Sequence, residues 1–493
     1  MELRNEAWRE ELRQNMKAKD RMALPRVKMN ELDGEYRSHN SEEVNRGLDL
    51  KQAMAEAKRC LDCPNPSCMQ GCPVNIHIPD FIKNIERGEI LEAAKVLKQT
   101  SALPAVCGRV CPQERQCESK CVHLKSGHEA VAIGYLERFA ADYERESGKM
   151  SLPQVAPALG IKIAVVGSGP CGLSFAGDMA KYGYDVTVFE ALHEIGGVLK
   201  YGIPEFRLPN AVVDVEIENL TKIGVKFVKD CIIGKTITVE ELKEQGFRAI
   251  FVASGAGLPN FMRIPGENLI GIMSSNEYLT RVNLMGAAKN TTDTPVTIGR
   301  RVAVIGGGNT AMDSVRTARR LGAEKAFIVY RRSESEMPAR AEEVKHAKEE
   351  GVEFMTLHNP IEYKGDEKGR VSAVVLQKME LGEPDASGRR SPQPIPGAVE
   401  TIEVDEVIVS VGVSPNPLIP NSVEGLNVSR KGTIEVNEDL QSSIPTIFAG
   451  GDIVRGGATV ILAMGDGRKA AAAMHDKFKK ANYNAYLCFL LFR

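Results

Sequence analysis

Tryptophan occurs once in the 493 residues, aromatic residues make up 5%, and no run of about 18 apolar residues appears. The first 20 residues carry charges throughout and lack the apolar region of a secretory signal. Lys and Arg number 63 against 65 Asp and Glu, a net charge of -2 that provides no electrostatic footprint for nucleic acid. We therefore expect a cytoplasmic protein that binds neither a membrane nor nucleic acid.

The pattern of the sequence changes near residue 150. Residues 1–150 contain helix-like stretches and no Val/Ile-rich strand, whereas short apolar runs alternate with glycines and helical stretches after residue 160. That alternation is typical of doubly wound parallel sheets, so we predict an α/β protein. The predicted divisions are a helical domain at 1–150, one dinucleotide-binding domain in two parts at 151–295 and 413–480, a second such domain at 296–412, and a C-terminal tail at 481–493.

Eight of the eleven cysteines lie between residues 60 and 121. They are Cys60, Cys63, Cys68 and Cys72 in one run and Cys107, Cys111, Cys117 and Cys121 in another. The first run resembles the bacterial ferredoxin pattern C-x2-C-x2-C-x3-C-P with a longer middle spacing. Four-cysteine sites also bind zinc, but the cysteine-proline steps favour two [4Fe-4S] clusters. The spacing does not decide which four cysteines share a cluster.

A complete dinucleotide fingerprint follows the apolar run 161–166. Gly167 is expected to form the tight turn, Gly169 to let a pyrophosphate approach the backbone, and Gly172 to permit close packing of helix on strand. The next predicted strand ends in Glu190, which suits ribose hydroxyls without a phosphate. The sequence therefore predicts FAD at this unit.

A second copy of this pattern begins after residues 302–305. Its turn contains Gly306 and Gly308 and opens a helix at Asn309, Thr310 and Ala311. Its second strand ends in Arg331 and Arg332 where the acid would stand, and Arg340 follows nearby. Arginines bind a 2′-phosphate that a carboxylate would repel, so this unit is predicted to bind NADPH. The alternative is that Arg331 and Arg332 form only a solvated basic edge.

A late segment completes the predicted flavin site. Gly451 and Asp452 follow a strand and precede a helix rich in small residues, which resembles the second flavin-binding motif of two-dinucleotide flavoproteins. There the aspartate binds the ribityl chain, and the helix N-terminus faces the flavin pyrimidine edge. The chain is thus expected to leave the FAD domain, form the NADPH domain, and return.

Across almost its whole length the chain resembles the small (beta) subunit of NADPH-dependent glutamate synthase. The motifs that carry this resemblance are CPVNIHIPDFI, LPAVCGRVCP, GGVLKYGIPEFRLP, GGGNTAMD, YRRSESEMPAR and AGGDIVRGGATVILAMGDGRKAA. The same family includes the large subunit of NADH-dependent ferredoxin:NADP oxidoreductase and the N-terminal half of dihydropyrimidine dehydrogenase.

The resemblance implies a crossed ligation of the clusters. One cluster would be held by Cys60, Cys63, Cys68 and Cys121, and the other by Cys72, Cys107, Cys111 and Cys117. The resemblance also implies that Gly197 and Arg207 contact FAD and that Gly308, Asn309 and Thr310 meet the NADPH pyrophosphate.

The implied function is electron transfer from NADPH through FAD and two clusters. NADPH gives two electrons at once and a cluster accepts one, so a flavin must stand between them. No side chain is assigned as a catalytic residue, because hydride transfer is carried by FAD and NADPH. The implied partner is a large subunit that makes glutamate from glutamine and 2-oxoglutarate. The alternative is the large subunit of a bifurcating enzyme, with a small flavoprotein and ferredoxin as partners.

Overall fold

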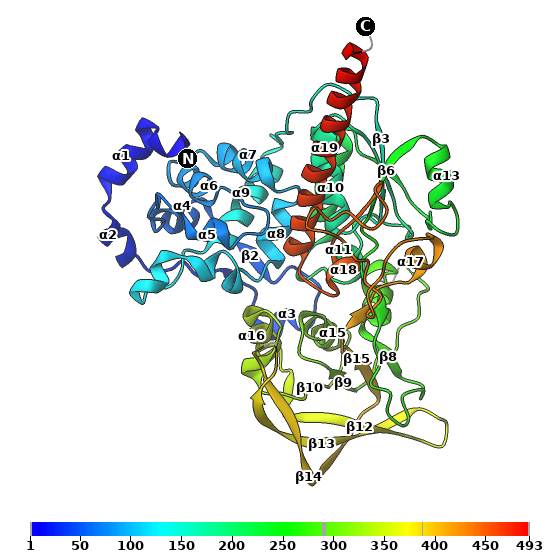
Figure 1. Cartoon of the computed structure of the whole chain (residues 1–493). Coiled ribbons are helices and arrows are strands. Elements are labelled where there is room, and N and C mark those ends of the chain that lie inside the picture. Colours follow the sequence, from blue (N-terminus) through cyan, green and yellow to red (C-terminus); the bar gives the residue numbers. More distant parts are fainter. Residues whose placement is uncertain (1, 288–291, 387, 492–493) are drawn as a thin grey trace.

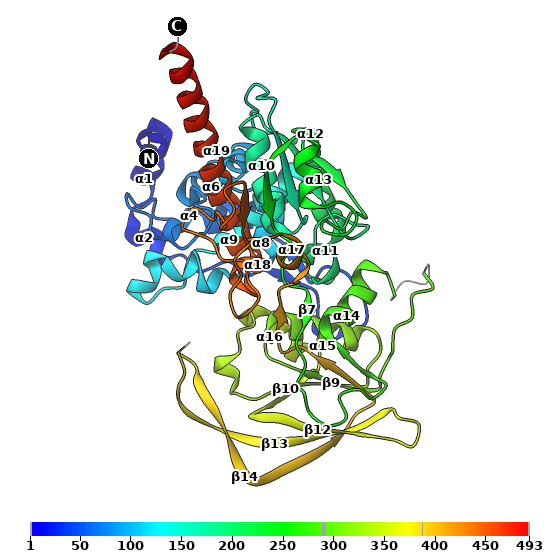
Figure 2. The same ribbon diagram turned by 45° about the vertical axis from the view of Figure 1, so that its right-hand side comes forward.

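The computed structural model describes residues 2–287, 292–386 and 388–491, with side-chain surroundings from residue 4 to residue 480 of those ranges. It contains a helical part and two five-stranded parallel sheets flanked by helices (Figures 1 and 2). The predicted α/β class, with a helical N-terminal part and two Rossmann-like units, is confirmed.

The helical part is built from short helices around an apolar core. Its helices are η1 (Glu2–Asn5), α1 (Ala7–Asn15), α2 (Ala18–Ala23), α3 (Gly34–Arg37), α4 (Leu50–Lys58), α5 (Ser67–Gln70), α6 (Ile78–Glu86), α7 (Ile90–Thr100), α8 (Pro104–Val110), η2 (Gln113–Arg115), η3 (Glu118–Lys120), η4 (Val122–Ser126) and α9 (Ile133–Ser147). Two short antiparallel strands pair beside them, β1 (Asn30–Glu31) and β2 (Asn45–Gly47). Phe81, Leu97 and Leu136 are fully buried where α6, α7 and α9 meet. This shared core is needed because isolated helices of such length are unstable in water.

The first sheet has the order β17-β6-β3-β4-β5, and all its strands are parallel. Its strands are β3 (Lys162–Val166), β4 (Asp185–Phe189), β5 (Lys226–Val228), β6 (Phe247–Val252) and β17 (Ile447–Ala449). Its helices are α10 (Pro170–Lys181), α11 (Val198–Tyr201), α12 (Asn210–Lys222), α13 (Val239–Glu244), α17 (Leu418–Ser422), α18 (Asp452–Arg455) and α19 (Val460–Leu491). Strand β17 comes after the strands of the second sheet in sequence, so the chain returns to the first sheet.

The second sheet has the order β11-β10-β9-β15-β8 and is also parallel. Its strands are β8 (Ile272–Ser274), β9 (Arg301–Ile305), β10 (Lys325–Tyr330), β11 (Glu353–Thr356) and β15 (Glu406–Val409). Its helices are α14 (Ser275–Leu279), η5 (Thr280–Leu284), α15 (Asn309–Arg320), η6 (Glu334–Glu336) and α16 (Ala341–Glu349). A separate antiparallel sheet lies beyond it (Figure 2), formed by β12 (His358–Gly365), β13 (Val371–Pro384) and β14 (Arg390–Glu403).

The chain passes between the two parallel sheets earlier than predicted. The predicted boundary after residue 295 is wrong, because β8 already pairs with β15 of the second sheet. Strand β8 has three residues, too few to be recognised from alternation or apolar length. The two crossings run side by side as an antiparallel pair, β7 (Leu258–Pro259) with β16 (Val413–Ser414). The predicted return at residue 413 therefore coincides with the second crossing.

The C-terminal division also differs from the prediction. Helix α19 continues from Val460 to Leu491, so residues 481–491 extend a helix of the first sheet and do not form a separate tail. The side chains of this extension, and residues 492 and 493, lie outside the described part. Among the described residues, no helix combines the length and the apolar character that crossing a bilayer needs.

One apolar core joins the helical part to the first sheet. Leu103 and Val106 of the helical part, Val213 of α12 and Met464 of α19 are fully buried members of this core. The helices around the second sheet pack in a core of their own, which includes Met312 and Val315 of α15. The cysteine-rich part is thus fixed against the predicted flavin domain by apolar packing.

Candidate cofactor and electron-transfer site

The two glycine turns have the geometry that the fingerprint predicts. A Cβ at Gly167 would lie 2.5 Å from the carbonyl oxygen of Ala253, and one at Gly172 would lie 2.1 Å from that of Gly167. A Cβ at Gly169, which caps α10, would meet no atom within 4 Å. Close packing thus excludes side chains at Gly167 and Gly172, while the space over Gly169 is open for a phosphate group.

The acid at the end of β4 is held against the first turn. Glu190 is buried, and its Oε2 accepts hydrogen bonds from the backbone N (2.9 Å) and the Oγ (2.6 Å) of Ser168. The Ser168 hydroxyl in turn accepts a bond from the backbone N of Gly196 at 2.9 Å. A Cβ at Gly197 would lie 2.9 Å from the Cα of Gly169. The loop that contains Gly197 therefore lies directly over the turn, as a flavin contact there would require.

The return segment brings Gly451 and Asp452 to α10, the helix that begins at the first glycine turn. A Cβ at Gly451, whose φ is +73°, would lie 2.9 Å from the Cβ of Cys171 on α10. Cys171 is a buried packing residue here. Burial raises the pKa of Asp452 to about 6, and its Oδ1 accepts a bond from Ala458 N at 3.1 Å. The two predicted flavin motifs are thus in contact at the start of α10.

Arg207 lies at the junction of the two domains. Its Nη1 is 2.8 Å from Asp313 Oδ2 on α15, and its Nε is 3.2 Å from Glu343 Oε1 on α16. Both partners belong to the second domain, and the side chain is almost fully buried among them. The predicted role of Arg207 as a flavin contact therefore gains no support, because its guanidinium is engaged in joining the domains.

The second turn repeats the first with small differences. A Cβ at Gly306 would lie 2.3 Å from Ser410 O, whereas one at Gly308 would meet only Pro338 Cγ at 3.9 Å. Ala311 takes the place of the third glycine and is fully buried. Asn309 Oδ1 accepts a bond from the backbone N of Arg340, and Thr310 is exposed at the start of α15. An open phosphate position is again present beside a helix N-terminus.

The three arginines predicted for the 2′-phosphate are placed differently from one another. Arg331 is exposed immediately after β10. Arg332 is buried, with Nη2 2.5 Å from Asp385 Oδ2 and Nε donating to Arg390 O at the tip of the β13–β14 hairpin. Arg340 donates to Arg109 O and Gln113 Oε1 of the helical part, each at 2.7 Å. The structure therefore leaves Arg331 as the exposed cation of the three, and Arg340 holds two domains together.

The first cysteine group surrounds one cavity. The cavity is lined by Cys60, Cys63, Cys68 and Cys121, together with apolar residues that include Ile78 and Ile82. Burial raises the pKa of Cys60 to about 11, and burial together with its three cysteine neighbours raises the pKa of Cys68 further. Four thiolates around one cavity repel one another unless a cationic centre lies between them, so the donor set fits a cluster.

The second cysteine group is Cys72, Cys107, Cys111 and Cys117, and it is more deeply buried than the first. Burial raises the pKa of Cys72 to about 11 and also that of Cys117, and the carboxylate of Glu137 adds to both shifts. Glu137 is almost fully buried on α9, burial raises its pKa to about 8, and its Oε1 has no hydrogen-bond partner. Sequence reasoning missed this residue because it follows the cysteine runs without a motif. The second group thus offers five side chains for four ligand positions.

The second cysteine group also borders the flavin domain. Cys107 Sγ lies 3.4 Å from Met464 Sδ of α19, and a Cβ at Gly465 would lie 3.0 Å from Pro73 O. Helix α19 begins at Val460, eight residues after Asp452, so the second group contacts the helix that follows the predicted flavin motif.

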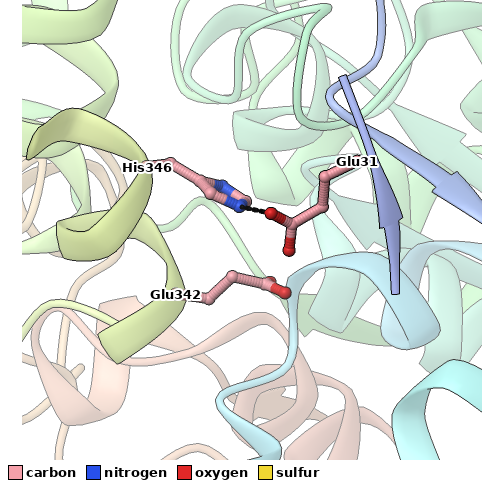
Figure 3. A group of neighbouring side chains, drawn as sticks. All are labelled: Glu31, Glu342 and His346. Carbon is pink, nitrogen blue, oxygen red and sulfur yellow. Dashed lines mark ion pairs between the residues drawn. The ribbon is translucent and has the colours of Figure 1, made fainter. Parts of the chain in front are cut away.

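Another set of metal-binding residue types occurs where β1 meets α16 (Figure 3). Glu31 faces His346 and Glu342, and its Oε2 lies 3.4 Å from His346 Nε2. Two cations already neutralise these acids, since Lys345 Nζ is 2.9 Å from Glu31 and Arg340 Nη2 is 3.0 Å from Glu342. We therefore interpret the set as ion pairs that hold the helical part to the second domain.

Comparison with known families agrees with this division of the chain. The family model described as dihydropyrimidine dehydrogenase domain II, 4Fe-4S cluster, matches residues 37–149. The model described as pyridine nucleotide-disulphide oxidoreductase matches residues 157–467. The structure of FprA from Mycobacterium tuberculosis in complex with NADPH has a TM-score of 0.55 at 21% identity, covering 66% of this chain and 86% of that one. At that identity the likeness concerns the fold alone.

Curated relatives extend over most of the sequence. The glutamate synthase (NADPH) small chain of Halomonas elongata is 38% identical over 434 residues, covering 86% of this chain and 91% of that one. The corresponding small chain of Escherichia coli K12 is 39% identical over 429 residues, covering 85% and 90%. The putative oxidoreductase UacF of the same organism is 38% identical, covering 88% and 69%. Because the two small chains are 38–39% identical and about 90% of each is covered, the chain belongs to the family of the glutamate synthase (NADPH) small chains.

Proposed function

We propose that the chain is the NADPH-oxidising small subunit of a glutamate synthase. It would oxidise NADPH at FAD and pass electrons through two [4Fe-4S] clusters to a large subunit that makes glutamate from glutamine and 2-oxoglutarate. The observation that carries the proposal is the contact of Cys107 with Met464, because it places a cysteine group against the flavin domain. Flavin can take the two electrons of a hydride and release them singly, which is the chemistry that this order of sites needs.

The residues that would hold each group follow from the geometry. The open turn at Gly169, the acid Glu190, the loop at Gly197 and the Gly451–Asp452 motif would bind FAD. The turn at Gly306 and Gly308 and the start of α15 would bind NADPH. The first cluster would be held by Cys60, Cys63, Cys68 and Cys121. The second would be held by Cys72, Cys111 and Cys117 together with Cys107 or Glu137.

Metal analysis tests the proposal directly. Chain purified without oxygen is expected to carry about eight iron atoms, the content of two four-iron clusters. Stoichiometric zinc with little iron would overturn the iron-sulfur function. The isolated chain should also show the absorption spectrum of bound flavin, and a colourless preparation would remove the flavin from the proposal.

Nucleotide preference is expected to depend on Arg331. Arg331→Ala should raise the KM for NADPH about 10- to 100-fold over the change for NADH, because a hydrogen bond to a charged group contributes ~1.5–3 kcal/mol. Steady-state kinetics with an artificial acceptor at the flavin measure both constants. Arg300→Ala is a matched control, since Arg300 is exposed near the start of β9 and pairs with Glu324. Equal effects on NADPH and NADH would show that Arg331 is only a solvated charge.

A further inference from the structure

An N-terminal arm, residues 2–24, lies along the outer side of the cysteine-rich part (Figure 1). It contains η1, α1 and α2 and precedes the matched 4Fe-4S region, which begins at residue 37. Three of its arginines reach the loop between Cys60 and Cys63. The arm therefore contacts the loop that carries two cysteines of the first group.

The centre of these contacts is Asp62. It stands between Cys60 and Cys63, its side chain is fully buried, and its φ of +53° is left-handed. Aspartate is one of the few residues besides glycine that adopt this conformation, and here the side chain is also held by charged contacts. A buried carboxylate beside two cluster ligands also requires positive partners, because an isolated charge is strongly disfavoured in the interior.

The arm supplies those partners. Arg9 Nη2 lies 2.6 Å from Asp62 Oδ1, and Arg9 Nε donates to both carboxylate oxygens at 3.0 and 3.1 Å. Arg13 binds Asp62 Oδ2, and Arg4 Nε donates to the backbone carbonyl of Asp62 at 3.1 Å. Arg9 is itself buried and also pairs with Asp80. A bidentate pair of this kind fixes direction as well as charge.

A second cation holds the other end of the loop. Lys83 is fully buried, and its Nζ donates to the carbonyl oxygen of Cys60 and pairs with Glu86, which also pairs with Arg21 of the arm. The residues Cys60 to Cys63 are thus fixed from two sides by charged contacts. Positive charge and hydrogen bonds near a cluster make its reduction easier, because reduction adds a negative charge.

We propose that the arm is a positioning element for the first cluster and sets its reduction potential. Arg9 and Arg13 hold Asp62 in its left-handed conformation, so that Cys60 and Cys63 face the cavity. Their positive charges offset the carboxylate of Asp62 and favour the reduced cluster. This inference rests on the proposed function, since it requires a cluster at the first group.

Charge substitutions test this role by the direction of their effects. Arg9→Met removes a positive charge, and we expect the potential of one of the two clusters to become more negative. Asp62→Asn removes a negative charge, and we expect the same potential to become more positive. The double variant should return close to wild type, because the two changes cancel. Redox titration of the full chain, followed by electron paramagnetic resonance, measures the potentials, and iron analysis reports cluster content.

The matched control is Arg87→Met. Arg87 is exposed, its Cζ lies 3.9 Å from the centre of the Trp8 ring in the arm, and its Nε donates to Asn84 Oδ1. This substitution therefore removes a contact of the arm without removing a partner of Asp62. The reduction potentials of both clusters should be the same in Arg87→Met as in the wild-type chain. Shifts of the same sign in Arg9→Met and Asp62→Asn would overturn the proposal. If Arg9→Met does not fold, an Asp62→Asn chain that holds both clusters at wild-type potentials overturns it equally. A wild-type chain without iron would instead overturn the proposed function.

Discussion

A Cys63→Ser chain is expected to keep NADPH-dependent dye reduction and to lose glutamate synthesis to background when a large subunit is added. Cys63 belongs to the first cysteine group. The second group borders α19, where Cys107 contacts Met464 and Pro73 lies against Gly465. A dye that takes electrons at the flavin bypasses both groups, so its reduction needs only NADPH and FAD. Parallel assays of dye reduction and glutamate formation measure the separation.

Cys231→Ser is the control for this experiment. Cys231 is buried in a core of the first sheet, apart from both cysteine groups, so its substitution should leave both activities in place. Loss of dye reduction in Cys63→Ser would show that the flavin site depends on the first group. Glutamate formed by the isolated chain would contradict the proposed division of labour. Reduction of ferredoxin with a small flavoprotein, and no glutamate with a large subunit, would favour the bifurcating enzyme.

The site predictions that rest on short sequence intervals concern the glycine turns and the cysteine runs. Gly167, Gly169 and Gly172 lie within six residues, and a turn of that form follows from the backbone that a phosphate requires. The cysteine runs are likewise read from short intervals. By contrast, the assembly of the first four-cysteine cavity depends on Cys121 meeting Cys60 across the helical fold, and a spacing rule carries no information about such a contact.

The predictions that changed concern charged residues with distant partners. Arg207 and Arg340 follow motif positions, but their partners are Asp313 and Glu343 in one case and Arg109 and Gln113 in the other. An arginine in a sequence has no visible preference between a phosphate and a carboxylate, because its guanidinium binds both. The partner of each arginine is determined by how the domains pack, and here both side chains lie at domain junctions.

The fourth ligand of the second cluster is expected to be Glu137. Glu137→Leu removes the carboxylate at similar volume, and we expect the iron content to fall from about eight to about four atoms. The physical reason is that Glu137 Oε1 is buried without a hydrogen-bond partner, a costly state that an iron ligand bond would relieve. Cys107 Sγ already contacts Met464 Sδ at 3.4 Å, so Cys107→Ala should keep most of its iron.

The matched control is Glu216→Gln, a change at a second buried carboxyl. Burial raises the pKa of Glu216 to about 7, but its Oε1 accepts a bond from Ala105 N at 2.9 Å, which an amide oxygen can also accept. That variant should keep about eight iron atoms, because neither ligand set loses an atom. The opposite result, with iron lost in Cys107→Ala and kept in Glu137→Leu, would assign the position to Cys107. In that case the unpaired carboxyl of Glu137 would need another partner, and its raised pKa indicates a proton, since burial favours the neutral acid near pH 7.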